Sequence, residues 1–109
     1  MSWTKKAFEH SKKSYPHESC GMLIKKNQEL IFCPCKNIAI DHPELSFVID
    51  PKDWAKYEDE GEVVGIIHNH PDGELQFSET DIKSCNHLDV DFYLVDHVTQ
   101  SMISIKPQN

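Results

Sequence analysis

The sequence predicts an α/β domain in which a mixed β-sheet lies between helices. Amphipathic stretches of helical period alternate along the chain with short apolar runs of strand length. The clearest strand is residues 63–67, which are mostly β-branched. A chain of 109 residues with 39 % hydrophobic residues can build one buried core, so we expect a single domain over residues 1–109.

The first half of the chain is expected to contain one helix and two strands. Pro16 ends the helix because proline cannot continue a regular turn. Pro34 lies inside the second strand and has no backbone N–H, so that strand is expected to be interrupted or at the edge of the sheet. The expected elements are an amphipathic helix at residues 3–14, a strand at residues 20–24, a hairpin turn at residues 27–28, a return strand at about residues 29–38 and a loop at residues 38–43.

The second half is expected to alternate strands with helices. Asp50 fits an N-cap, Pro51 fits a first helical residue, and Gly61 fits the C-terminal stop of the helix between them. Trp54 lies on the apolar face of this helix and is expected in the core. The remaining expected elements are strands at residues 47–49, 63–67, 90–95 and 99–105 and a helix at residues 79–87.

Charge and hydropathy exclude two classes of partner. The formal net charge is −7 and lysines occur at most in adjacent pairs, which argues against nucleic acid. No apolar run approaches membrane-spanning length and the first residues lack a signal-peptide core, so we expect no membrane partner and a cytoplasmic location. In that compartment the cysteines are expected to be buried free thiols. They are Cys20, Cys33, Cys35 and Cys85.

The apolar run at residues 63–67 ends in a His-x-His pair, His68 and His70. Side chains two apart on a strand point to the same side, so both rings could reach one ion across roughly 6.6 Å between their Cα atoms. Ser78 fits a helix N-cap with Asp81 at the third helical position. Two imidazoles and one carboxylate leave one open position, as catalytic zinc requires. Taken alone, Ser-x-x-Asp is usually only a cap and His-x-His is weak evidence of a metal.

A zinc hydrolase also needs a carboxylate that takes the proton of its water and hands it to the leaving amine. Glu18 is the candidate, because it begins an expected strand beside Ser19-Cys20-Gly21, where a side chain can project from a sheet edge. A single glutamate is otherwise most often a solvated surface charge. The assignment of Glu18 therefore depends on the whole pattern.

That pattern resembles a known family. Glu18, the string His68-x-His70-Pro71 and, seven residues later, Ser78-x-x-Asp81 are similar to the JAMM (MPN+) zinc metallopeptidase motif. The string Pro16-x-Glu18-x-Cys20-Gly21 is similar to the prokaryotic and phage branch of that family. Residues 47–54, and Ser78-Glu79-x-Asp81, look like its phage tail-assembly members. The resemblance covers about residues 3–105.

The resemblance implies a sheet flanked by helices, layered as in the cytidine-deaminase fold. It implies that His68, His70 and Asp81 bind one Zn²⁺. Glu18 would be the general acid/base, and Ser78 would hydrogen-bond the substrate carbonyl in the oxyanion role. The family hydrolyses peptide or isopeptide bonds, often next to ubiquitin-like modifiers.

The resemblance also implies a class of partner and a location for the protein. The expected partner is a peptide or protein substrate, with a ubiquitin-like tail protein as one candidate, and the expected place is the host cytoplasm or the virion tail. Phage relatives often continue into a second domain that resembles NlpC-type cysteine peptidases. Residues 1–109 contain no such domain, so we expect no cell-wall activity of that kind from them. The short segment at residues 41–46 suggests an open cleft, and with it either a weakly selective enzyme or one that takes its selectivity from a partner.

Three alternatives remain beside the peptidase. The first is a non-catalytic, zinc-stabilised binding or scaffold domain in tail assembly. The second is a zinc deaminase, but this needs His-x-Glu and Pro-Cys-x-x-Cys, and the chain has Asn69 after His68 and no Cys-x-x-Cys. The third is a cysteine peptidase using Cys20, or a metal clip at Cys33-Pro34-Cys35. The other histidines, His10, His17, His42, His87 and His97, are expected to lie at the surface or to form hydrogen bonds.

Overall fold

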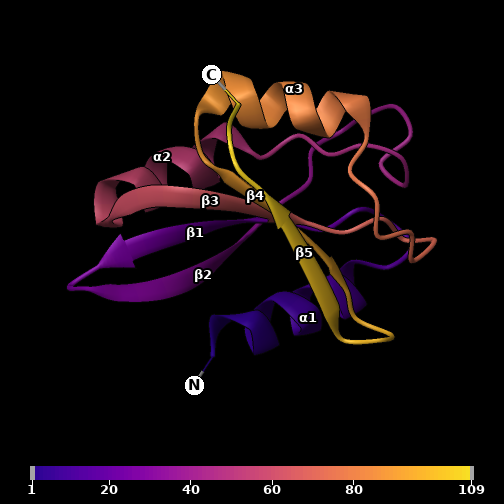
Figure 1. The fold of residues 1–109 in the computed structure, drawn as a ribbon, viewed down its shortest axis with the longest axis horizontal. Coiled ribbons are helices and arrows are strands. Elements are labelled where there is room, and N and C mark those ends of the chain that lie inside the picture. Colours follow the sequence, from indigo (N-terminus) through magenta and orange to yellow (C-terminus); the bar gives the residue numbers. More distant parts are fainter. Residues whose placement is uncertain (1, 109) are drawn as a thin grey trace.

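A mixed sheet with helices on both of its faces forms the centre of the molecule (Figure 1). The structure is a computed structural model and describes residues 2–108. Within this range the elements are α1 (Trp3–Ser14), β1 (Cys20–Lys26), β2 (Glu29–Cys35), α2 (Pro51–Glu60), β3 (Glu62–His68), α3 (Glu79–Leu88), β4 (Asp91–Asp96) and β5 (Ser101–Ile105). The five strands are ordered β2-β1-β3-β4-β5. The predicted α/β class with a mixed sheet between helices is confirmed.

The directions of the strands bring the start of β1 and the ends of β3 and β4 to the same end of the sheet. β1 runs antiparallel to β3, so its first residue, Cys20, pairs with the last residue of β3, His68. β4 runs parallel to β3 and places Leu94 beside His68. The residues just before β1 and just after β3 are therefore neighbours in space. This arrangement brings Glu18 and the His-x-His pair together.

Two apolar clusters lie on opposite faces of the sheet. On one face α1 contacts β2 and β4, and Ala7 packs with Leu23 and Ile67. On the other face α2 and α3 cover a cluster that includes Met22 and Ile66. Figure 1 shows α1 below the sheet, with α2 and α3 above it. Side chains alternate along a strand, and this explains why the consecutive residues Ile66 and Ile67 belong to different clusters.

Several sequence-based boundaries are confirmed by local geometry. Asp50 caps α2 by accepting from Lys52 N–H, and the N–H of Gly61 closes the helix on Tyr57. The hairpin turn has positive φ at both Asn27 and Gln28, as a tight turn between antiparallel strands requires. β2 is an edge strand, as its internal proline indicated.

The expected strand at residues 47–49 is wrong. One isolated bridge, between Asn37 and Ile49, stands in its place, and β2 ends at Cys35 rather than near residue 38. The Asn37 side chain supplies the reason. Its Oδ1 accepts from the N–H groups of Ala39 and Val48, and its Nδ2 donates to the carbonyl of Ser46. These side-chain bonds satisfy backbone groups that a strand ladder would otherwise use.

Smaller differences concern ends of elements and half-buried groups. The last strand begins at Ser101 rather than at residue 99, because Asp96 binds Thr99 in the preceding turn. The helix expected at residues 79–87 extends to Leu88. Trp54 is half-buried against the cluster under α2, rather than fully in the core.

The cysteines are free and buried, as expected. Burial raises the pKa of the Cys20 thiol to about 12 and that of Cys33 to about 11, and it also raises the pKa values of Cys35 and Cys85. None of these thiols has the lowered pKa that a catalytic nucleophile needs. Separately, no helix in the described part of the chain has the length and hydropathy needed to cross a bilayer.

Candidate metal centre

Two imidazoles and a carboxylate meet at the carboxyl end of β3. His68 is the last residue of that strand and is fully buried, while His70 lies two residues beyond it and is half-buried. Their ring centroids are 5.3 Å apart. Asp81 Oδ2 lies 3.2 Å from His68 Nε2 and 3.3 Å from His70 Nε2. The structure therefore brings together the three side chains that the sequence suggested as metal ligands.

Asp81 is aimed at the histidines by the way α3 begins. Its Oδ2 accepts the N–H of Ser78 at 2.9 Å, while Ser78 Oγ accepts the N–H of Asp81 at 3.0 Å. This reciprocal capping box fixes the carboxylate at the helix N-terminus. Desolvation alone would raise the pKa of Asp81, but both histidines and the Ser78 N–H outweigh it and hold that pKa well below its usual range. The cap and the metal ligand are thus compatible roles for one residue.

His68 has no hydrogen-bond partner at either ring nitrogen among the described residues. The 3.2 Å approach of Asp81 to its Nε2 does not have hydrogen-bond alignment. A buried polar atom without a partner costs about 1–3 kcal/mol, and such groups are rare in folded proteins. Coordination of a cation by Nε2 would remove much of this cost. The residues present therefore fit a metal ion.

His70 presents the nitrogen that a metal needs. Its Nδ1 lies 3.2 Å from the carbonyl oxygen of Glu74. A carbonyl can only accept, so Nδ1 carries the hydrogen, and in the neutral ring Nε2 keeps its lone pair toward His68 and Asp81. Metal-binding histidines are commonly oriented by such a bond at the other nitrogen. The contact with Asp81 raises the pKa of His70, with desolvation opposing and the Glu18 charge adding to the rise.

Glu18 faces the same pair of imidazoles from the β1 side. A carboxylate oxygen of Glu18 and nitrogens of His68 and His70 all lie within 4.8 Å of one another. The side chain is 4 % exposed. Burial raises the pKa of Glu18 to about 7, His70 opposes this rise, and the charges of Asp81 and Asp72 add to it. Glu18 is therefore a buried carboxylate poised near neutrality, as a proton-transfer group should be.

The structure corrects the setting of Glu18. It was expected to begin a strand, but β1 starts two residues later, at Cys20. Its backbone is instead held by side chains and loops: its N–H donates to the carbonyl of Pro43, and its carbonyl accepts from Asn37 Nδ2. The position of Glu18 thus depends on the loop that replaces the expected strand.

Asn69 is a site residue that the motif alone did not reveal. Its side chain is 1 % exposed, and its Oδ1 accepts from both the backbone N–H and the hydroxyl of Ser19, at 2.6 and 2.7 Å. It links the His-x-His segment to the residue after Glu18. The available signal was its place between two histidines, which directs its side chain to the opposite side of the chain from theirs. Its partner, fifty residues away, leaves no local trace in the sequence.

Known proteins with similar sequences identify the family of this chain. Residues 2–106 match the family described as prokaryotic homologues of the JAB domain. The chain belongs to this family. It is also 33 % identical, over 99 residues, to the tail tip assembly protein K of Escherichia phage N15. That match covers 91 % of the chain and 40 % of the relative, so the chain spans less than half the length of this relative.

Solved structures support the same fold. A protein of Desulfitobacterium hafniense, determined in solution, superposes with a TM-score of 0.72 at 17 % identity, over 94 % of this chain and 76 % of that one. A JAB1/MPN domain protein from Archaeoglobus fulgidus gives a TM-score of 0.62 at 22 % identity, over 95 % and 83 %. The resemblance drawn from the motif is confirmed for family and fold.

Proposed function

We propose that this JAB-family chain is a zinc-dependent peptidase or isopeptidase. The observation that carries the proposal is the fully buried His68, whose ring nitrogens have no hydrogen-bond partner within residues 2–108, while Asp81 and Glu18 each approach the pair formed by His68 and His70. JAB and MPN domains include peptidases, and the chain keeps every residue type of their motif.

His68, His70 and Asp81 would hold the Zn²⁺. Two neutral imidazoles and one carboxylate leave the ion with net positive charge. A bound zinc would supply Lewis acidity, which lowers the pKa of a water toward neutrality and polarises a carbonyl. The capping box fixes the Asp81 carboxylate at the start of α3, and the two histidines together with the Ser78 N–H keep it ionised, which supports its role as a ligand.

Glu18 would be the general acid/base. It is buried beside the histidines and its pKa is raised to about 7, so it can accept a proton from the attacking water and give it to the leaving amine. Its carboxylate could instead contact the metal directly, since it lies as close to the histidines as a ligand would. A Glu18→Gln variant that keeps zinc and loses turnover would assign the proton-transfer role.

Ser78 would stabilise the substrate carbonyl oxygen. Its Oγ already accepts the N–H of Asp81, and this bond uses a lone pair but not the hydroxyl hydrogen. The side chain is exposed and lines the same cavity as Glu18 and His70. Its O–H is therefore free to donate to an oxygen on which negative charge develops.

The substrate would be a peptide or a protein, and the relative from phage N15 suggests tail assembly as the setting. A ubiquitin-like tail protein is one candidate substrate, and the host cytoplasm or the virion tail is the corresponding location. Because this relative is a tail tip assembly protein, a second candidate function is a zinc-stabilised scaffold without turnover. Tail assembly supported equally by the parent chain and Glu18→Gln would favour the scaffold.

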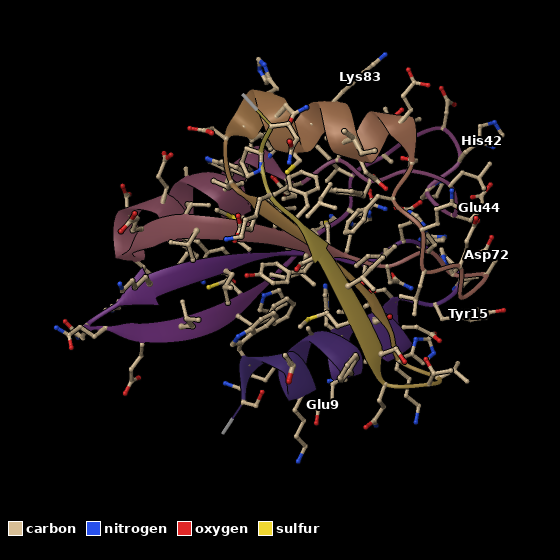
Figure 2. All side chains as sticks on the ribbon, viewed as in Figure 1. Glu9, Tyr15, His42, Glu44, Asp72 and Lys83 are labelled. Carbon is tan, nitrogen blue, oxygen red and sulfur yellow. The ribbon has the colours of Figure 1, made fainter. Side chains whose placement is uncertain are left out.

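The test combines metal analysis with cleavage of peptide libraries. The parent protein should contain about one zinc per chain and cleave, and Glu18→Gln should keep the metal and lose at least about 100-fold in turnover. Glu9→Gln is the matched control, because Glu9 is exposed on α1, which lies on the opposite face of the sheet from α2 and α3 (Figure 2). A zinc-loaded parent that cleaves no member of the library would contradict the proposal.

A further inference from the structure

A cavity of about 530 Å³ extends from the candidate metal centre into the layer between the sheet and the helices α2 and α3. At one end it is lined by Glu18, His70, Ser78 and Asp81. Its volume lies within the range of small-molecule and side-chain binding sites, about 300–1,000 Å³. The cavity is therefore much larger than a metal and a water require.

Away from the metal centre the cavity is apolar. Ile66 and Phe92, both 1 % exposed, form its floor on β3 and β4. Trp54 of α2 and Leu88 of α3 form walls. Phe47 closes the side toward the loop and packs against the His68 ring, with centroids 4.8 Å apart. An apolar group placed here would be in contact with the side chains that flank the site.

One face of α3 connects the two ends of the cavity. Asp81, Ser84 and Leu88 all line it, and their spacing of three and four residues puts them in one row along the helix. Asp81 is at the metal end, Ser84 is in the middle and Leu88 is at the apolar end. A substrate whose scissile bond lies beside Ser78 and Asp81 would thus extend its adjacent side chain along this row.

The rim of the cavity is acidic. Glu44, Asp72 and Glu74 line it, and no lysine or arginine does among the described residues. Figure 2 shows Glu44 and Asp72 on the same side of the molecule, whereas Lys83 points outward from α3. The whole chain carries a formal charge of −7. This field favours a cationic occupant and disfavours a nucleotide or an acidic peptide.

We propose that the cavity binds a large apolar side chain, aromatic or branched, of a peptide that carries a basic residue beside it. The inference rests on the proposed function only in placing this side chain next to the hydrolysed bond. Binding of the side chain itself depends on the walls between α2 and α3. It should therefore be measurable without turnover and in metal-free protein.

The experiment uses three capped dipeptides as probes and reads binding from backbone amide shifts in NMR spectra. N-acetyl-Phe-Lys-amide should bind at least about tenfold more tightly than N-acetyl-Ala-Lys-amide and N-acetyl-Phe-Glu-amide, and should shift resonances of β3, α3 and the 44–49 loop. A tenfold change corresponds to 1.4 kcal/mol, a typical difference for side-chain burial in such a pocket. Equal binding of all three probes would overturn the inference.

Ser84→Leu fills the middle of the cavity and should weaken binding of the Phe-Lys probe at least tenfold. Lys83→Leu is the matched control, because it places the same side chain at the preceding position of α3, which faces outward. This variant should bind the probe as the parent does. If Ser84→Leu does not fold, Leu88→Gln makes the wall polar at a side chain that is already 40 % exposed and should give the same loss. Unchanged binding in a folded Ser84→Leu or Leu88→Gln variant would overturn the inference.

The two proposals fail separately. Selective binding of the Phe-Lys probe with no hydrolysis of any peptide would keep the cavity assignment and remove the peptidase. Hydrolysis of peptides with equal kcat/KM for phenylalanine and alanine at this position, together with equal binding, would keep the peptidase and remove the cavity assignment.

Discussion

Asn69 Oδ1 accepts hydrogen bonds from both the backbone N–H and the hydroxyl of Ser19. Asn69 stands between the two site histidines, and Ser19 follows the site glutamate. One buried amide oxygen therefore joins the end of β3 to the segment before β1. The two segments are fifty residues apart in sequence, and this link adds to the pairing of β1 with β3 in holding the proposed base near the proposed metal ligands.

Replacing Asn69 should affect turnover and zinc binding to different extents. Asn69→Ala leaves the Ser19 N–H and hydroxyl without their acceptor and should destabilise the protein by about 1–3 kcal/mol in urea unfolding. Turnover should fall more than zinc affinity, because His68 stays on β3 while Ser19, the residue after Glu18, loses its anchor. Ser19→Ala removes only the hydroxyl bond and should show a smaller effect in both measurements. Full activity in Asn69→Ala would contradict this positioning role.

Removing zinc should lower the thermal stability of the protein. The metal binds the native arrangement of His68, His70 and Asp81 and not the unfolded chain, so it stabilises by mass action, by about 4 kcal/mol at a thousandfold excess over Kd. Scanning calorimetry with and without a chelator measures the shift in Tm. His68→Ala should abolish the shift, while His87→Ala, at an exposed position of α3, should keep it.

Zinc affinity should fall as the pH is lowered. The pKa of His70 is raised above its usual 6.5 because Asp81 and Glu18 favour the imidazolium, and that proton must leave before Nε2 can bind a metal. Below the pKa of His70 the apparent affinity should decrease about tenfold per pH unit. Competition titrations with a chelating dye across this range test the slope. An affinity that does not depend on pH would contradict coordination by His70.

In the metal-free protein, Glu18 should make stability fall with rising pH. Burial raises its folded pKa from 4.5 to about 7, so within this window the folded state holds a proton that the unfolded chain has released. The contribution of Glu18 is therefore most favourable below about pH 4.5 and is lost as pH rises through 7. Glu18→Gln should be more stable than the parent by ~1–3 kcal/mol above pH 7, with the difference vanishing below pH 4.5. Urea unfolding in chelator measures it.

Much of this site could be predicted because its parts depend on local rules. The β-branched run before His68 indicated a strand that leads into the two histidines, and Ser78-x-x-Asp81 indicated a capped helix. Both local structures form as expected, and they bring the side chains together. The position of β2, which contains Pro34, at the edge of the sheet followed in the same way from the missing N–H.

What could not be predicted depends on contacts between distant segments. The amide of Asn37 holds together the loop that looked like a strand, and the amide of Asn69 holds Ser19. The pKa of Glu18 depends on burial, which no single-sequence pattern reports. The cavity under α2 and α3 is likewise a product of packing, since its lining residues come from separate segments between Glu18 and Phe92.

The central claim is that His68, His70 and Asp81 converge on one cation. Native mass spectrometry of the purified protein, with zinc titrated into a metal-free sample, tests it most directly. We predict one zinc per chain in the parent and in Glu18→Gln, and none at the same zinc concentration in a His68→Ala, His70→Ala double variant that remains folded. One tightly bound zinc in that folded double variant, or none in the parent, would contradict the account.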